Sequence, residues 1–154
     1  MENEYQRFRA YGNQLIEIHI GLRDMLADLR EGVVPGRELG AHCLTFCAAV
    51  TRHHTGEDNG VFPFLAARHP ELRDFLGRLE RDHQVIAGML GRVQRTAAEL
   101  QPGNEPEPGR EAVIRAELDG LAAVLETHFI GEEKRLVAVL NALEASADLP
   151  GLTT

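Results

Sequence analysis

Apolar residues recur at steps of three and four along most of the chain, and this spacing is the period of an α-helix. Four such segments follow one another, at about residues 8–29, 39–57, 72–100 and 114–143. No alternating pattern of useful strand length competes with them. The sequence therefore predicts an all-α protein built from four amphipathic helices.

Stretches that contain glycine and proline separate these segments. They lie at Gly32–Gly36, from Asn59-Gly60 through Pro63 to His69-Pro70, and at Pro102–Gly109. Short connections make consecutive helices antiparallel, so we predict an up-down-up-down antiparallel four-helix bundle. A chain of this length fits one domain over residues 1–154, with a core at about 8–145 and a tail at 146–154.

Charge and composition narrow the expected partners and location. The formal net charge of −8 argues against a nucleic-acid partner, because such proteins need a basic surface. No apolar run approaches the roughly 18 residues of a membrane-spanning helix, and the charged N-terminus does not resemble a signal peptide. We therefore expect a cytoplasmic protein without a membrane partner. Cys43 and Cys47 lie one helical turn apart and are expected to be reduced core residues.

Each predicted helix carries a histidine on its apolar stripe, and two of these histidines precede a glutamate by one turn. The histidines are His19, His53, His83 and His128, and the glutamates are Glu57 and Glu132. Burying six such polar groups in an apolar core is costly unless something binds them. A metal ion is the simplest occupant, and the mixture of nitrogen and oxygen donors suits iron, zinc or manganese.

The turns place these residues at one height in the bundle. Residues equally far from the turn of an antiparallel hairpin lie side by side. The midpoint of residues 19 and 53 falls at residue 36, inside the first turn. The midpoint between the 53–57 pair and His83 falls at residue 69. The midpoint between His83 and the 128–132 pair falls inside the 102–109 stretch. We therefore expect one polar layer across the bundle.

Six donors in one layer favour two metal ions, since one tetrahedral zinc uses at most four. A glutamate one turn after a histidine can share its ion or reach a second one as a bridge. The alternative for any single histidine is an ordinary hydrogen-bonded core residue. His42, His69 and Glu133 lie off the apolar stripes, and we expect them at the surface.

The run HHTGEDNGVFPFL from His53 to Leu65, together with His19, Asp82-His83 and the run HFIGEE from His128, resembles the hemerythrin-like HHE cation-binding family. The resemblance covers roughly residues 10–145. It implies a four-helix bundle that holds a non-haem centre of two iron ions, oxo- or hydroxo-bridged. It also implies that Glu57 and Glu132 are the bridging carboxylates and that the four stripe histidines are terminal ligands.

The chain departs from the oxygen carriers of that family, which place two histidines one turn apart on the third helix. Here Leu79 and Ala87 flank His83 at that spacing, and neither side chain binds a metal. One ligand position is therefore vacant or filled from elsewhere. His54 is the first candidate to fill it, the alternative being a histidine near the rim. The weaker candidates are Tyr5, Tyr11 and Glu80.

These observations lead to a functional hypothesis with two alternatives. We expect a di-iron protein that binds or reduces a small oxygen-derived ligand (O2, peroxide or NO) at an open iron position, as a peroxide-consuming oxidoreductase if it turns over. One alternative is an iron or oxygen sensor, or an iron store, without turnover. The other is a metal-free bundle used for interaction. Ferritin-like chemistry is rejected, because its two Glu-x-x-His motifs are not both present.

Overall fold

The computed structural model describes residues 4–100 and 108–147, and every regular element within them is helical. The long helices are α1 (Glu4–Arg30), α2 (Gly36–Gly56), α4 (Arg73–Glu99) and α5 (Arg110–Ala147). Between α2 and α4 lie a π-helical turn η1 (Glu57–Val61), the short helix α3 (Phe62–Arg68) and a 3-10 turn η2 (Pro70–Leu72). The all-α class predicted from the apolar period is confirmed.

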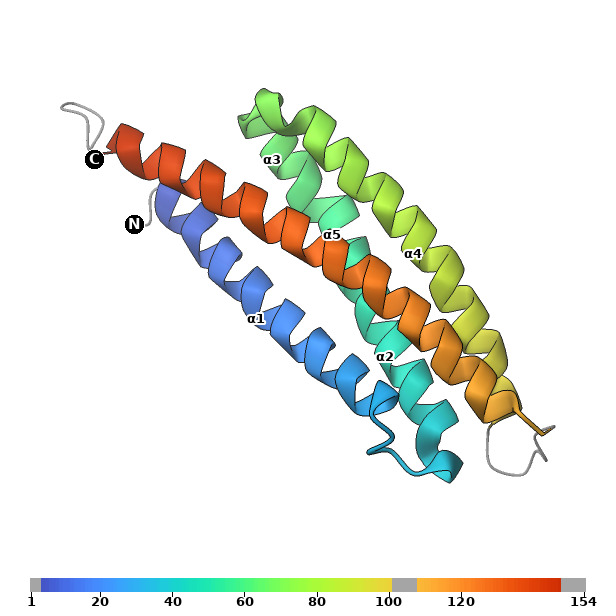
Figure 1. Cartoon of the computed structure of the whole chain (residues 1–154). Coiled ribbons are helices and arrows are strands. Elements are labelled where there is room, and N and C mark those ends of the chain that lie inside the picture. Colours follow the sequence, from blue (N-terminus) through green and yellow to red (C-terminus); the bar gives the residue numbers. More distant parts are fainter. Residues whose placement is uncertain (1–3, 101–107, 148–154) are drawn as a thin grey trace.

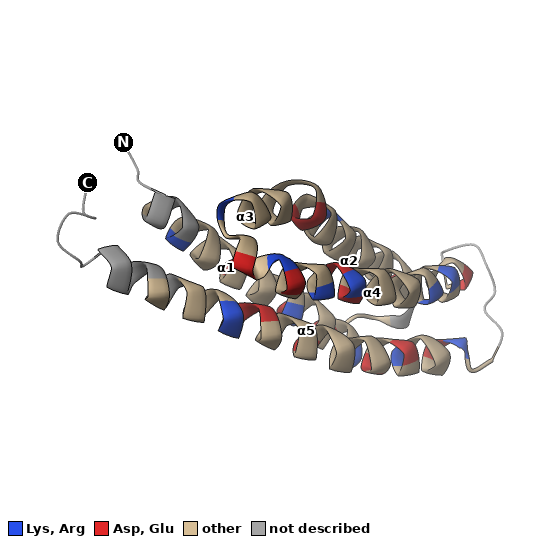
Figure 2. Ribbon diagram, turned by 90° about the horizontal axis from the view of Figure 1, so that it is seen from above, with Lys and Arg blue, Asp and Glu red and all other residues tan. Residues whose placement is uncertain are grey.

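The four long helices form a bundle around a common core. Helix α1 packs against α2 and α5, and α4 packs against the same two helices on the other side (Figure 1). Figure 2 shows acidic and basic residues interspersed along α4 and α5. No helix within the described ranges is long and apolar enough to cross a membrane.

The apolar core is divided into two clusters. The larger cluster includes Leu22 on α1, Val50 on α2, Ile86 on α4 and Leu125 on α5. The smaller one is built by these residues: Leu15, Phe62, Leu65, Leu72, Leu76, Leu79 and Leu136. Along α1, α4 and α5, and along α2 with its continuation into α3, the predicted polar positions fall between members of the two clusters. The polar layer is therefore covered by apolar side chains on both sides.

The second helix continues where the sequence predicted a disturbance at Asn59-Gly60 and Pro63. It passes through the π turn η1 and then runs on as α3 to Arg68. Pro63 lies in the first turn of α3, where its missing amide hydrogen is tolerated. A π turn adds one residue to the helical repeat, and such turns often occur at functional sites. Because of this extra residue, Phe62 is buried while Val61 is only partly buried.

Two glycines are required by the backbone or by packing. Gly32 ends the turn after α1 with a φ of 75°, a left-handed conformation that suits glycine. Gly40 lies where α2 and α4 approach closely. A Cβ atom at this position would lie 2.7 Å from the carbonyl oxygen of Ala97. The backbones of α2 and α4 are therefore in close contact at Gly40.

Cys43 and Cys47 are buried free thiols, as expected. Of the predicted loop at residues 102–109, only Pro108 and Gly109 lie inside the described residues, where they form a turn. The tail from residue 148 and the side chain of Tyr5 lie outside the described part.

Candidate metal centre

The structure brings the six predicted ligand residues into one layer at the middle of the bundle, and His54 joins them. These seven residues are His19 on α1, His53 and His54 on α2, Glu57 on η1, His83 on α4, and His128 and Glu132 on α5. All of them are buried except His53, which is partly buried. Five imidazoles and two carboxylates therefore meet inside an apolar bundle.

The seven side chains divide into two groups that could each hold a metal ion. His54, Glu57, His83 and His128 form one group, which we call the three-histidine group. His19, His53 and Glu132 form the other, the two-histidine group. Within each group one donor atom per residue lies within 4.8 Å of all the others. The arrangement thus offers two adjacent cation positions.

Glu57 connects the two groups. Its Oε1 atom lies 3.3 Å from Nε2 of His83 and 3.6 Å from Nε2 of His53. In the two-histidine group, Nε2 of His19 lies 3.2 Å from Nε2 of His53 and 3.3 Å from Oε1 of Glu132. The hydroxyl of Tyr11 donates a hydrogen bond of 3.1 Å to the other carboxylate oxygen, Oε2, of Glu57. Glu57 is therefore held from one side and offers its second oxygen to both groups.

The donor atoms at the centre of the layer fit a bound cation. Within the described part of the chain, buried Nε2 atoms of His54, His83 and His128 make no hydrogen bond, and neither do Oε1 of Glu57 and both oxygens of Glu132. Buried polar atoms are rarely left in this state, because each costs the free energy of its lost hydration. These atoms belong to the two donor groups, and within each group one donor atom per residue lies within 4.8 Å of the others. A metal ion satisfies them together.

His54 lies where the sequence left a ligand position open. Its ring stacks on the ring of His83 at a centroid distance of 3.8 Å and an interplanar angle of 10°. It also meets the ring of His128 edge-on at 5.3 Å. Of the weaker candidates, Tyr11 reaches Glu57 through its hydroxyl, whereas Glu80 is exposed on α4.

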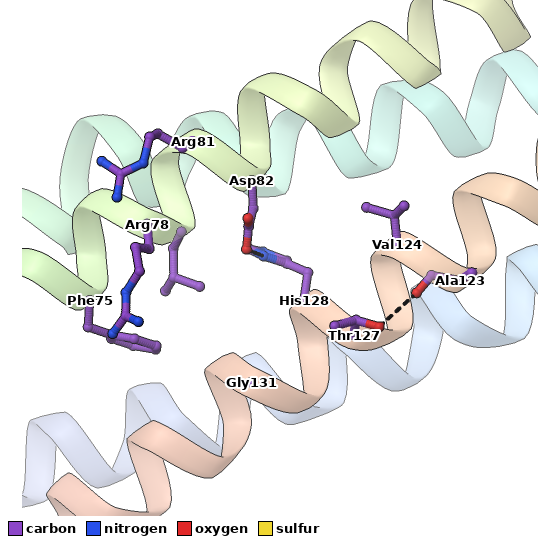
Figure 3. Close-up of a pocket in the computed structure, with 10 residues that line it drawn as sticks. Phe75, Arg78, Arg81, Asp82, Ala123, Val124, Thr127, His128 and Gly131 are labelled. Atoms are coloured by element: carbon purple, nitrogen blue, oxygen red, sulfur yellow. Dashed lines mark hydrogen bonds and ion pairs between the residues drawn. The ribbon is translucent and has the colours of Figure 1, made fainter.

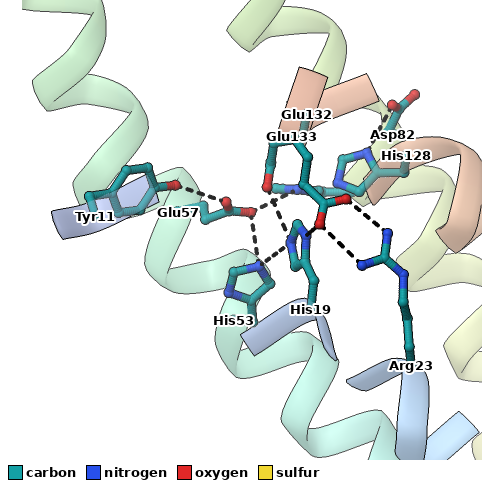
Figure 4. Close-up of polar contacts among 10 residues, drawn as sticks. Tyr11, His19, Arg23, His53, Glu57, Asp82, His128, Glu132 and Glu133 are labelled. Carbon is teal, nitrogen blue, oxygen red and sulfur yellow. Dashed lines mark hydrogen bonds and ion pairs between the residues drawn. The ribbon is translucent and has the colours of Figure 1, made fainter. Parts of the chain in front are cut away.

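Two carboxylates without a predicted role support the histidines from outside the layer. His83 donates a hydrogen bond from Nδ1 to Asp58 at 2.7 Å. His128 donates one from Nδ1 to Asp82 at 3.0 Å (Figure 4). Each bond leaves Nε2 as the free lone pair. Such partners fix the ring orientation and tautomer of metal-binding histidines. Their one signal in the sequence is adjacency, since Asp58 follows Glu57 and Asp82 precedes His83.

The predicted surface position of Glu133 is wrong. Its side chain is only 18% exposed, and its Oε1 atom lies 3.6 Å from Nδ1 of His19. Arg23 on α1 holds the same carboxylate through two hydrogen bonds of 3.1 and 2.8 Å. The periodicity misplaced Glu133 because a residue next to the apolar stripe can turn into the groove between two helices. His42 is exposed, as predicted. The surface position predicted for His69 is also wrong, since this residue is partly buried at the end of α3, with 14% of its side chain exposed.

Burial keeps several of the imidazoles neutral. It lowers the pKa of His54 to about 2 and the pKa of His53 to about 4. The pKa of His128 is also lowered by burial, although Asp82 opposes the shift. Burial alone would lower the pKa of His83, but Glu57 and Asp58 outweigh it and leave that pKa raised. Neutral imidazole is the form that binds a metal.

The two central carboxylates shift in the opposite direction. Burial raises the pKa of Glu132 to about 7. Burial also raises the pKa of Glu57, with a further contribution from the nearby charge of Glu132. Two carboxylates inside an apolar bundle therefore resist ionisation together unless positive charge lies between them. A divalent or trivalent cation provides that charge.

Two hollows lead from the surface toward the three-histidine group. The larger, about 670 Å³, lies between α4 and α5, and the pair of Asp82 and His128 lies among its lining residues (Figure 3). The smaller, about 170 Å³, lies between α2 and α4 and reaches His54 and His83. The layer is thus buried but lies close to solvent on these two sides.

The comparisons with known proteins agree with this chemistry. The family model of the hemerythrin HHE cation binding domain matches residues 12–146, a range that includes every member of the layer. Neither the curated proteins nor the solved structures contain a match to the chain.

Proposed function

Because the chain belongs to the hemerythrin HHE cation-binding family, we propose that it is a non-haem di-iron protein that binds or reduces a small oxygen-derived ligand. The observation that carries this proposal is the pair of adjacent donor groups joined by Glu57. Imidazole together with carboxylate suits iron, and a single zinc would leave at least three of the seven donors without a metal. The proposal includes up-down-up-down connectivity, which the course of the chain in Figure 1 supports.

In this proposal each residue has a defined role. His54, His83 and His128 would hold one iron, and His19 and His53 would hold the other. Glu57 and Glu132 would be the carboxylates common to both positions. Iron held in this way would supply redox chemistry for a small ligand such as O2, peroxide or NO.

The two positions differ in how many protein donors they receive. The three-histidine group has one more imidazole than its neighbour, and each group includes one carboxylate. The two-histidine position therefore retains more room for a ligand from solution. We propose that the small ligand binds there, beside His19 and His53.

An aromatic side chain covers one histidine ring in each position. Phe129 stacks on His19 at 3.9 Å, and Phe62 lies over His83 at 5.6 Å. Both phenylalanines are buried. A dry and apolar surrounding strengthens the electrostatic contacts in the layer and limits side reactions of a bound ligand with water.

Iron reconstitution tests the metal content. Metal-free protein loaded anaerobically with ferrous iron and then desalted should retain about two irons per chain, measured by mass spectrometry. His53→Ala should retain about one, whereas His42→Ala, a change of an exposed histidine on the same helix, should retain two. A wild-type content of one or zero would contradict the di-iron proposal.

Ligand assays test the chemistry. NO added to the reduced protein should change its visible absorption with a saturable dependence, and the His53→Ala variant should lack this response. Consumption of excess peroxide over many turnovers would identify an oxidoreductase, whereas saturable binding without consumption would identify a sensor or binding protein. Absence of any response to O2, peroxide and NO would contradict the proposal.

A further inference from the structure

Arg23 belongs to neither donor group, but two of the residues that it contacts lie against His19 of the two-histidine group. Its guanidinium donates two hydrogen bonds to Glu133, from Nη1 at 3.1 Å and from Nη2 at 2.8 Å (Figure 4). A third hydrogen bond, of 2.9 Å, runs from Nε to Glu126 on the same helix as Glu133. This paired geometry fixes a carboxylate in both position and orientation. Arg23 thus holds one side of α5 against α1 next to the layer.

The carboxylate that Arg23 holds faces His19. Oε1 of Glu133 lies 3.6 Å from Nδ1 of His19, which is longer than a hydrogen bond, so the carboxylate acts on this nitrogen through its charge and favours a proton there. At the far side of the ring, Nε2 of His19 lies 3.3 Å from Oε1 of Glu132 and 3.2 Å from Nε2 of His53. A proton on Nδ1 leaves a lone pair on Nε2, the atom that faces Glu132 and His53. Whatever holds Glu133 therefore also influences how His19 presents its donor atom.

Arg23 reaches the same histidine by a second route. Its guanidinium carbon lies 5.3 Å from the ring centroid of Phe129, within the range of a cation–π contact. Phe129 in turn stacks on His19, with ring centroids 3.9 Å apart and an interplanar angle of 17°. One arginine thus supports both the edge and the face of the His19 ring.

The other group is supported in a different way. His83 and His128 bond directly to Asp58 and Asp82, and among the described residues neither aspartate pairs with an arginine or lysine. His19 has a more distant carboxylate that an arginine restrains. The orientation of His19 therefore depends on a third residue, whereas that of His83 and His128 does not.

We propose that Arg23 is a positioning residue for the two-histidine metal position, acting through Glu133 and Phe129 on the ring of His19. This inference rests on the two-metal function proposed above. In this proposal Arg23 supports metal binding at the two-histidine position, and the three-histidine position does not depend on Arg23.

Geometry and simple charge predict opposite effects for the loss of Arg23. A guanidinium near a cation site repels the cation, so on charge alone its removal should strengthen metal binding. If positioning dominates, removal should weaken binding at the second position by about 10- to 100-fold, the usual effect of losing an outer partner of a metal ligand. The sign of the change therefore separates the two explanations.

Titration with Co²⁺ alone, followed by calorimetry and visible absorption, measures this sign. Wild-type protein should bind two equivalents, and His53→Ala identifies which of them belongs to the two-histidine position. Arg23→Gln should weaken that equivalent by about 10- to 100-fold and leave the other unchanged. Arg23→Lys keeps the charge without the paired hydrogen bonds and should restore only part of the loss.

Arg30→Gln provides the matched control. Arg30 is seven residues further along α1 and also bonds to α5, through Asp119 at 2.8 Å, but it lies away from the layer. Tighter or unchanged binding in Arg23→Gln, or an equal loss in Arg30→Gln, would overturn the role of Arg23. A wild-type protein that binds fewer than two equivalents would instead contradict the proposed function itself.

Discussion

The imidazole rings of His54 and His83 lie parallel, with centroids 3.8 Å apart, although one belongs to α2 and the other to α4. This stack places a histidine from the second helix in the group that otherwise has one histidine from each of α4 and α5. A neighbouring helix thus provides the imidazole that the third helix lacks.

His54→Ala should therefore reduce metal binding at the three-histidine group. Loss of a direct donor should cost at least the roughly 10- to 100-fold in affinity that loss of an outer partner costs. His42→Ala is the control, because this exposed histidine on the same helix should leave both metal equivalents unchanged. Co²⁺ titration measures the two equivalents, and an unaltered pair in His54→Ala would show that this histidine is not a ligand.

Asp82→Asn should weaken the same position by acting on His128. The change keeps the size of the side chain but removes the charge that accepts the Nδ1 hydrogen bond of 3.0 Å. We expect an affinity loss of about 10- to 100-fold. Glu80→Gln, on an exposed side chain of the same helix, should have no effect. Equal metal affinities of the wild type, Asp82→Asn and Glu80→Gln would contradict a supporting role for Asp82.

The stability of the metal-free protein should respond to pH through Glu132. Burial raises the pKa of this carboxyl from 4.5 to about 7 in the folded state. Its contribution to stability is therefore fully present below about pH 4.5 and is lost as the pH rises through 7. Glu132→Gln cannot ionise and avoids this loss.

Denaturant unfolding of both metal-free proteins at several pH values tests this linkage. The variant should match the wild type below pH 4.5 and become more stable by about 3 kcal/mol near pH 8. The same variant should lose iron binding, because it removes a carboxylate that the metal needs. A stability difference that stays constant across this pH range would contradict the assignment.

Two glycine substitutions should have opposite effects on the free energy of unfolding. Gly40→Ala would place a Cβ atom 2.7 Å from the carbonyl oxygen of Ala97, so α2 and α4 would have to move apart, at a cost of about 1–3 kcal/mol. Gly88→Ala meets nothing within 4 Å in the middle of α4 and should stabilise the protein by about 0.5–1 kcal/mol. Thermal unfolding of the two variants provides the comparison, and a stabilised Gly40→Ala protein would be inconsistent with the packing described.

The bundle and the polar layer were accessible from the sequence because both depend on periodicity. The apolar stripe fixes which side of each helix faces inward, and the turn midpoints fix the height of His19, His53, His83 and His128. Both rules use only the spacing of residues along the chain, and the packing of the helices agrees with them.

The supporting residues were not accessible in the same way. Asp58, Asp82 and Glu133 each lie one position away from a stripe residue, where the period assigns a residue to solvent. Their contacts depend on the groove between neighbouring helices and on a π turn that adds one residue after Gly56. Arg23 gave no signal at all, because its partners lie more than 100 residues away in the chain.

Anomalous diffraction from crystals of the iron-loaded protein, measured at the iron absorption edge, tests the central claim most directly. We predict two peaks per chain, one among His54, His83 and His128 and the other beside His19 and His53, with Glu57 and Glu132 between them. A single peak, or a peak outside this layer, would contradict the two-metal centre.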